Sequence, residues 1–484
     1  MFKQLAQDPR PPVDNPSLSY WQSPPHKGLL GVQSTTLPSI RDVIVIGSGI
    51  TSCSVTRELF EAGFSGTISV LEAREVCSGA TGRNGGRINC VAIQDYHKYV
   101  SLFGVEVAKS IVRFEMAHYD EIVKAAQSLG DEAFKRTEIR PVETVAVVFS
   151  EEKLQDLKSM LENFEAVFSD LRGRWKVIEA EEVRESYGVK DATGALIGTA
   201  GAGWAYRLIT EVFDRLLKDH PASFSIETKT MVTGISRIES NQYPYSIKTT
   251  RGVIRAKHVL HCTEGHVSHL VPQLRGILVP RRGQMSVLNP GNKFRDSRGN
   301  RSWSFYYDQG FDYVSQNEHT KELFAGGGDT FEFNQALSTF GVSSDAEENI
   351  RSKIHLAGFM PVAFGEKHWG EQDPGKPILK ASWVGVMCNS LDHVPFVGLL
   401  PQEALGPRPA GDWESGGEWI SAGYGGYGMV NAWLCGKALA RQIVGGQVPS
   451  WLPVVYQATP ARVTQLQNRL AKLKDTENHL RALL

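Results

Sequence analysis

The chain has 484 residues, of which 22% are charged and 41% hydrophobic, and its formal net charge is −1 at pH 7. These values are typical of a soluble globule, and the near-zero charge gives no reason to expect nucleic acid or an anionic membrane as a partner. The length exceeds what one ordinary hydrophobic core supports, so we expect two intertwined domains.

The first 40 residues hold many prolines and turn formers, so we expect an extended arm rather than a folded domain. No apolar run is long enough to span a bilayer, and the N-terminus has no hydrophobic signal segment. We therefore expect a cytoplasmic protein without a membrane partner. The six cysteines show neither C-x-x-C nor metal-ligand spacing, which favours reduced, buried thiols and no metal site.

A strand, a glycine turn and a helix are predicted over residues 42–61. Residues 43–46 form an apolar, β-branched run, which is typical of a strand buried on both faces. Gly47 allows a tight turn, Gly49 lets the backbone approach a diphosphate, and Ser52 stands where a third glycine usually allows close helix–strand packing. The helix that follows begins with bare N–H groups that can bind phosphate. The alternative is an ordinary strand–turn–helix with an incidental glycine pair.

The next predicted strand ends in an acid, Glu72. A carboxylate at this place can accept hydrogen bonds from both hydroxyls of an adenosine ribose, and it would repel a 2′-phosphate. Together with the glycine turn, it favours the binding of a dinucleotide other than NADP.

A second glycine-rich loop follows within ten residues, which a plain NAD site does not need. Its five small residues are Gly79, Ala80, Gly82, Gly85 and Gly86. Such a backbone can pass close to a flat ring system. Arg83 can neutralise diphosphate charge, and Asn84 can bond a ring edge. The alternative is a flexible surface loop with a solvated arginine.

Further elements follow in chain order. They are a helix over 104–129, a strand over 142–149, helices over 151–171 and 208–217, successive strands over 223–262 with a turn near Arg251-Gly252, an aromatic strand over 303–307, and a helical pattern in the tail 460–484. We see no internal repeat.

The segment 42–86 resembles the D-amino-acid-oxidase-type family of FAD-dependent oxidoreductases, which includes sarcosine and glutamylputrescine oxidases. Later motifs agree with this resemblance in type and order: His258–Thr263, Pro280–Met285, Trp383–Gly385 with Asp392–Gly398, and Ala422–Met429. The resemblance covers roughly residues 41–445. The opening Leu18–Trp21 is similar to uncharacterised fungal members.

The resemblance implies an α/β fold of two domains, in which a Rossmann-like FAD-binding domain of the glutathione-reductase type is interleaved with a mixed-sheet substrate domain. We expect the FAD-binding domain to comprise 41–103, 196–275 and 382–449, and the substrate domain 104–195 and 276–381. The arm over 1–40 precedes them, and a helical tail over 450–484 follows.

FAD is the cofactor that the resemblance implies, and it also indicates which residues bind it. They are Gly47, Gly49, Ile50, Thr51, Glu72, Ala73, Arg74, Gly79, Ala80, Thr81, Arg83, Asn84, Gly85, Gly86, Val232, Cys262, Thr263, Gln284, Gly425, Gly426, Tyr427, Gly428 and Met429. Arg87 is also expected to face the flavin. A helix that begins near Met429 could direct its positive end toward the flavin.

We expect the FAD to be noncovalent. The linking cysteine of sarcosine oxidases would correspond to Gly385 here, and no histidine stands near Arg83. Cys388 lies near the flavin by motif position, so a covalent link has to be considered.

Substrate residues are harder to choose. Tyr306 and Tyr313 are candidates for an aromatic pocket, and Arg282 for pairing a substrate carboxylate. The alternatives are a strand packed on the core and a structural ion pair. Tyr427 stands where relatives often place a histidine. Tyr307 and Trp204 are further candidates.

The function expected from these features is oxidation of the C–N bond of an amine or amino-acid-like small molecule, by hydride transfer to flavin N5. A tailoring oxidase of specialised metabolism or a 2-hydroxy-acid dehydrogenase on the same scaffold stays open, as does a flavin-binding protein with little turnover. The electron acceptor is O2 or another molecule. No lysine lies between Leu323 and Gly328, where sarcosine-type oxidases place an oxygen-activating one, so fast peroxide formation is in doubt. The sequence leaves monomer and homo-oligomer open.

Overall fold

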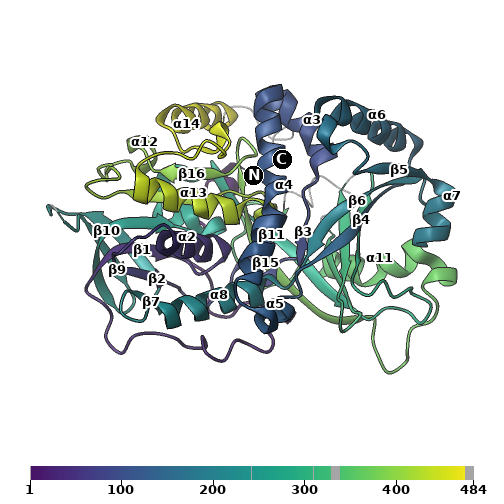
Figure 1. The fold of residues 1–484 in the computed structure, drawn as a ribbon, viewed down its shortest axis with the longest axis horizontal. Coiled ribbons are helices and arrows are strands. Elements are labelled where there is room, and N and C mark those ends of the chain that lie inside the picture. Colours follow the sequence, from purple (N-terminus) through teal and green to yellow (C-terminus); the bar gives the residue numbers. More distant parts are fainter. Residues whose placement is uncertain (1, 241, 309, 329–337, 475–484) are drawn as a thin grey trace.

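The computed structural model describes residues 2–240, 242–308, 310–328 and 338–474 (Figure 1). Two sheets organise this part of the chain, one of eight strands and one of nine. They lie in separate halves, and the long helix α4 (Val105–Gln127) runs through the centre between them (Figure 1). The expected two-domain α/β fold is confirmed.

The first sheet has the path β16-β17-β10-β1-β2-β7, with β8 and β9 attached beside β10. From β7 to β17 the neighbouring strands on this path are parallel, whereas β16 at the edge and the attached β9 and β8 pair antiparallel. The strands are β1 (Ile40–Ile46), β2 (Ile68–Leu71), β7 (Phe224–Glu227), β8 (Val232–Arg237), β9 (Tyr245–Thr249), β10 (Gly252–His261), β16 (Phe396–Leu399) and β17 (Glu418–Ala422). The central strand β1 is buried from Val43 to Ile46, as its apolar run predicts.

The second sheet has the path β15-β11-β14-β13-β12-β4-β6-β3, with β5 beside β6. It is mixed, because β12 pairs parallel to β4 while the other neighbours pair antiparallel. The strands are β3 (Arg87–Ile88), β4 (Arg140–Val148), β5 (Lys176–Glu179), β6 (Gly194–Ala202), β11 (Leu278–Leu288), β12 (Arg301–Tyr306), β13 (Phe311–Gln316), β14 (Leu323–Gly327) and β15 (Leu379–Ser390).

Three strands lie in the other sheet from the one expected, and the first is the short β3, which falls within 41–103 and pairs with β6. Residues 382–390, expected in the FAD-binding domain, belong to β15, which pairs with β11 along its whole length. Residues 196–202 belong to β6, which pairs with β4 from end to end. Sequence motifs did not reveal this, because sheet membership is decided by partners distant in the chain. The other expected domain boundaries stay predictions.

Helices cover both halves. The predicted helix over 50–61 is α2 (Ile50–Glu61), and the predicted helix over 208–217 is part of α8 (Ala205–Asp219). The remaining helices are α1 (Phe2–Leu5), α3 (Ala92–Phe103), α5 (Asp131–Thr137), α6 (Glu151–Val167), α7 (Ala180–Glu182), α9 (Val267–Leu270), α11 (Ile350–His368), α12 (Gln402–Leu405), α13 (Ala432–Gly445) and α14 (Pro460–Lys474). The part of the predicted tail helix beyond Lys474 lies outside the described residues. Helix α6 ends four residues before its predicted end, and a short 3-10 turn continues to Leu171.

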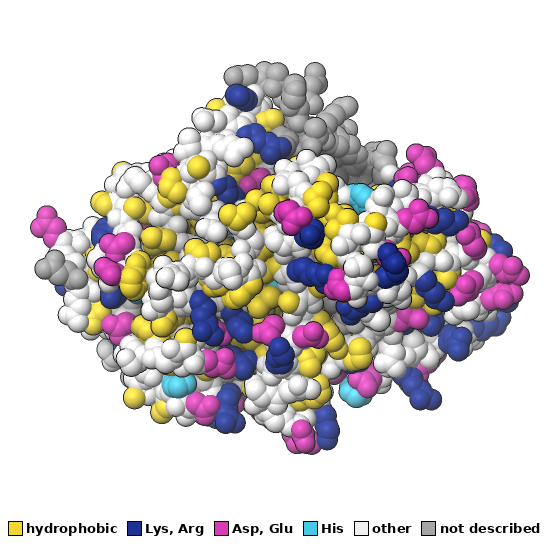
Figure 2. All heavy atoms as spheres, turned by 45° about the horizontal axis from the view of Figure 1, so that its top comes forward, with side chains coloured by type: hydrophobic (Ala, Val, Ile, Leu, Met, Phe, Trp, Pro, Cys, Tyr) yellow, Lys and Arg dark blue, Asp and Glu magenta, His cyan; other side chains and the backbone are white. Residues whose placement is uncertain are grey.

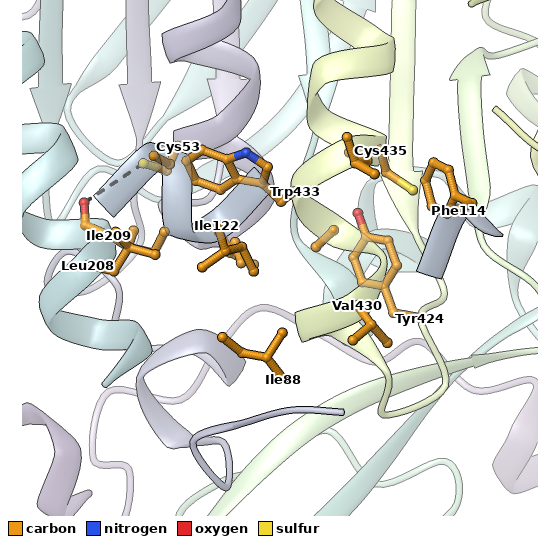
Figure 3. Close-up of a cluster of buried hydrophobic side chains, with 14 of the residues drawn as sticks. Cys53, Ile88, Phe114, Ile122, Leu208, Ile209, Tyr424, Val430, Trp433 and Cys435 are labelled. Carbon is orange, nitrogen blue, oxygen red and sulfur yellow. Dashed lines mark hydrogen bonds between the residues drawn. The ribbon is translucent and has the colours of Figure 1, made fainter. Parts of the chain in front are cut away.

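Close packing of α13 on α2 builds the core beside the first sheet. A Cβ on Gly436 of α13 would lie 2.8 Å from the Thr51 carbonyl oxygen and 2.8 Å from the Ser54 Cβ, so only glycine allows this approach. Figure 3 shows side chains of α2, α4, α8 and α13 converging there, with the Cys53 thiol directed at the Ile209 carbonyl. This packing fixes the position of the N-terminus of α2.

The surface shows no segregation of charge on the face that Figure 2 draws, where acidic and basic side chains are interspersed. Within the described residues, no helix combines the length and the apolar character that a membrane crossing requires.

Candidate cofactor and substrate site

A cavity of about 950 Å³ lies between the two halves and receives residues from both. It begins at the carboxyl ends of the parallel strands β1, β2 and β10, where α/β sheets bind ligands. It continues along β11, β12 and β15 of the second sheet. Its volume is at the upper end of the range of about 300–1,000 Å³ for small-molecule and cofactor sites.

The glycine turn after β1 forms one wall of the cavity. Gly47 has φ of +96°, a backbone conformation that side chains disfavour, and a Cβ there would lie 2.7 Å from the Cys262 carbonyl oxygen. Both the backbone and the lack of space therefore require glycine. A Cβ on Gly49 would lie 3.0 Å from the Thr81 hydroxyl oxygen. The Ile50 N–H donates to that hydroxyl at 3.0 Å. The first amide of α2 therefore has a partner within the protein, whereas the sequence led us to expect a free N–H group.

Glu72 stands where the sequence predicts, at the end of β2, and its carboxylate is buried and held in place. One oxygen accepts from the Ser48 hydroxyl at 2.6 Å and the Ser48 N–H at 3.1 Å. The other accepts from the Arg74 N–H at 2.8 Å. Since a carboxylate has about four acceptor sites and three are taken, capacity is left for one ribose hydroxyl.

Arg83 lies at the cavity but does not face it as a free cation. Its guanidinium donates to the carbonyl oxygens of Ser78 at 2.8 Å and Val384 at 2.9 Å, and it lies 3.3 Å from the Asp345 carboxylate. Arg74 also pairs with Asp345, at 3.0 Å through both nitrogens. Because Arg74 and Arg83 share this one carboxylate, the group keeps a net positive charge, and the expectation that Arg83 neutralises a diphosphate stays a prediction.

Asn84 and Gln284 are likewise engaged within the protein. The Asn84 side chain accepts from the Gly86 N–H at 2.8 Å and donates to the Thr81 carbonyl at 3.1 Å, so it braces its own loop. The Gln284 amide donates to Glu348 and to the Trp383 carbonyl at 2.9 and 3.0 Å. Both residues line the cavity.

The glycine turn before α13 also lines the cavity. Glu264 fixes this turn, since its carboxylate accepts from the N–H groups of Gly423 and Tyr424 at 3.0 and 3.2 Å. Burial raises the pKa of Glu264 to about 7, although these hydrogen bonds oppose the rise. A 3-10 turn spans Gly428–Val430 before α13 begins at Ala432, close to the predicted helix start.

Arg87 is a further cation that lines the cavity, and little in the protein compensates its charge. Its Nη2 donates to the Ser304 hydroxyl at 3.0 Å, and its guanidinium carbon lies 5.4 Å from the centre of the Tyr313 ring. Its Nε is buried without a hydrogen-bond partner, and no ion pair among the described residues includes it. Burial lowers the pKa of Arg87, and the nearby Tyr306 and Tyr427 act against that shift.

Three of the four proposed catalytic residues meet at this cation. Tyr306, Tyr313 and Tyr427 all line the cavity. Arg282 does not: it donates to the Glu347 carbonyl at 3.0 Å on the exposed side of β11, so alternation along the strand turns it away. Trp204 is buried outside the cavity.

All of the expected cofactor-binding residues line the cavity except Gly86. A Cβ on Gly86 would lie 3.0 Å from the Trp21 ring, so this glycine accommodates the N-terminal arm instead. Sequence reasoning missed Pro11 and Pro12, which line the cavity from the arm. No local motif marks them, because the arm meets the site only through the fold.

These features fit FAD. The glycine turn leaves room that a Cβ would fill, Glu72 is held at a strand end, and the cavity is long enough to reach both sheets. Among the residues described, no three His, Cys, Asp or Glu side chains are grouped so as to hold a metal ion.

Comparison with known proteins agrees. Residues 42–442 match the model of the family described as FAD dependent oxidoreductase. One curated relative is gamma-glutamylputrescine oxidoreductase of Escherichia coli (strain K12), 26% identical over 225 residues, which cover 45% of this chain and 48% of the relative. The chain therefore matches about half the length of that relative.

Solved structures share the fold at low identity. L-Proline dehydrogenase from P. horikoshii has a TM-score of 0.61 and 17% identity, over 87% of this chain and 98% of that one. L-Amino acid deaminase from Proteus vulgaris has a TM-score of 0.63 and 15% identity, over 90% and 98%. The glycine turn, the cavity and a family match over most of the chain lead to one conclusion: this chain belongs to the D-amino-acid-oxidase-type (DAO) family of FAD-dependent oxidoreductases.

Proposed function

We propose that this protein oxidises the C–N bond of an amino acid or a similar amine that carries a carboxylate. The observation that supports this most strongly is Arg87, a cation at the cavity with no ion-pair partner among the described residues. Leaving a guanidinium uncompensated in a half-buried site is costly, and an anionic substrate group would remove that cost. Solved structures with the same fold include an L-proline dehydrogenase, a glycine oxidase and an L-amino acid deaminase, and the substrates in these names point the same way.

The tyrosines around Arg87 suit the apolar part of such a substrate. Burial raises the pKa of Tyr306 to about 12, so this phenol is neutral at pH 7. It would donate a hydrogen bond and give the pocket an apolar surface, and it would not act as a base. The neighbouring Asp95 carboxylate and, after it, burial raise the pKa of Tyr427 as well. In this proposal Arg87 binds the substrate carboxylate, and the tyrosine rings surround the remainder of the substrate.

FAD, when bound, supplies the acceptor for the hydride that leaves the substrate carbon. The chain has to hold the neutral amine in one orientation and keep water out of the reacting region. Arg87 would anchor one end of the substrate, and Tyr306 and Tyr313 would limit its rotation. The imine that forms is then hydrolysed by water.

We further propose that the FAD is held without a covalent bond. Cys262 is the cysteine that lines the cavity in the described part of the chain, and burial raises the pKa of its thiol to about 12. A thiol that stays protonated is a weak nucleophile. Cys388 is fully buried outside the cavity, and burial raises the pKa of its thiol too.

The test is anaerobic reduction of the FAD-loaded protein by matched pairs, each an amino acid and the amine left after its decarboxylation. We expect amino acids to bleach the flavin and the matched amines to do so at least about tenfold less efficiently, as the loss of a charge-assisted hydrogen bond requires. Equal reduction by both members of each pair would contradict the proposal. Reduction only by 2-hydroxy acids would favour the hydroxy-acid alternative, which offers Arg87 the same carboxylate.

A further inference from the structure

The N-terminal arm precedes the segment that matches the family, yet it contacts the glycine loop of the cofactor site. The family match begins at residue 42, and the contacts come from Ser17–Gln22, which we term the clasp. Nothing in the family match accounts for these contacts, so they are a property of this chain.

Side chains of the clasp donate hydrogen bonds to carbonyl oxygens of the glycine loop. The Ser19 hydroxyl and the Gln22 side-chain amide both donate to the Gly82 carbonyl, at 2.7 and 3.0 Å. The Trp21 indole N–H donates to the Asn84 carbonyl at 2.5 Å. Gln22 also donates to the Ser78 carbonyl at 3.2 Å. Three carbonyls of one short loop are thus turned toward the arm.

The clasp is itself fixed to the rest of the protein. The Trp21 ring stacks on Phe324 with centroids 3.9 Å apart, and the Trp204 indole donates to the Trp21 carbonyl at 2.6 Å. Ser17 donates to the Asp345 carbonyl at 2.8 Å and accepts from the Val384 N–H at 3.1 Å. The clasp therefore cannot shift without breaking contacts to both β14 and β15.

Peptide geometry gives these contacts a consequence for the cavity. In a trans peptide the C=O and the next N–H point in opposite directions. Holding the carbonyls of Asn84 and Ser78 toward the clasp therefore turns the N–H groups of Gly85 and Gly79 away from it. Gly85 and Gly79 both line the cavity. Backbone N–H groups aimed in this way form binding sites for anionic or carbonyl oxygens.

We propose that the clasp is part of the FAD site: it orients the loop amides that receive the cofactor and thereby sets FAD affinity. Ser19, Trp21 and Gln22 are positioning residues, since each acts through the loop backbone. The inference rests on FAD binding in this cavity and not on the identity of the substrate.

The test compares FAD binding to apo-protein in three single variants and one double variant. Trp21→Phe keeps a ring to stack on Phe324 but removes the donor to Asn84, and Ser19→Ala removes a donor to Gly82. Leu18→Ala is the matched control, because Leu18 belongs to the clasp, directly before Ser19, and is 89% exposed. We expect the Trp21→Phe, Ser19→Ala double variant to bind FAD about tenfold more weakly, from two lost hydrogen bonds, and Leu18→Ala to bind as the wild type does.

Hydrogen exchange of residues 79–86 in the apo-protein gives a second readout that needs no cofactor. We expect faster exchange there in the double variant, with the far strands β7 and β17 unchanged. Ser19→Ala alone keeps Trp21 and its packing, so it serves if the double variant does not fold. Unchanged FAD affinity in a folded variant, or a loss of stability with FAD affinity intact, would overturn the proposal. Since no substrate is used, a failure of the amino-acid assignment would appear only in turnover.

Discussion

The two halves of the site differ in what defines them. On the side of the first sheet, the cavity is shaped by backbone: a glycine at positive φ, a strand end and the start of α2. On the side of the second sheet it is shaped by side chains that come from distant strands, with Arg87 from β3, Tyr306 from β12 and Tyr313 from β13. A backbone-defined site is constrained locally and suits an invariant cofactor, whereas a side-chain-defined site can change its substrate by single substitutions.

The largest effect is expected from closing the backbone-defined side. Gly47→Ala would put a Cβ 2.7 Å from the Cys262 carbonyl oxygen, so we expect FAD affinity to fall about a hundredfold or more. Gly63→Ala is the matched control, since Gly63 also has positive φ, at +81°, but has open space around its Cβ. Both variants should lose about 1–2 kcal/mol for the left-handed backbone. FAD affinity is measured by titration of apo-protein. Equal affinity in the two variants would contradict the view that backbone shape defines the first half of the site.

The second prediction concerns the side-chain-defined half. Arg87→Met should raise KM for an amino acid by about a hundredfold while FAD affinity stays within about twofold, because the lost interaction is a charge-assisted one with the substrate alone. Arg282→Met removes an arginine on the same sheet that does not line the cavity. Steady-state kinetics measure KM for both variants. A larger rise in KM for Arg282→Met than for Arg87→Met would contradict the assignment of Arg87 to the substrate.

The smallest effect is expected where the two halves meet. Glu115 of α4 is buried and accepts from the Tyr99 hydroxyl at 3.0 Å, and burial raises its pKa to about 8 from 4.5. The folded protein then keeps a proton that the unfolded chain has released. Stability from this group is therefore fully present below about pH 4.5 and is lost as pH rises to about 8.

Glu115→Gln removes this titration and keeps an acceptor for Tyr99. Between about pH 5 and about pH 6.5, the free energy of unfolding of the wild type should fall by about 2 kcal/mol more than that of the variant. Urea unfolding at several pH values measures this difference. Parallel pH profiles for the two proteins would mean that Glu115 is ionised throughout.

The same division explains what could be predicted from sequence. The turn at Gly47, the helix α2 and the acid at Glu72 are local, because each follows from neighbouring residues and their backbone preferences, and all three were predicted correctly. The ion-pair partner of Arg83 and the orientation of Arg282 could not be predicted from neighbouring residues. Arg83 meets Asp345 from 262 residues away, and Arg282 faces away from the cavity because of the register of β11. The arm contacts of Trp21 depend on the same long-range packing.

One structure would test the central claim most directly: the protein crystallised with FAD and a slowly reacting amino-acid analogue. The account predicts the FAD diphosphate beside residues 47–50, the adenosine ribose at Glu72, and the analogue's carboxylate within hydrogen-bond distance of the Arg87 guanidinium. A carboxylate bound elsewhere while Arg87 contacts only protein, or an FAD that does not follow the glycine turn, would contradict it.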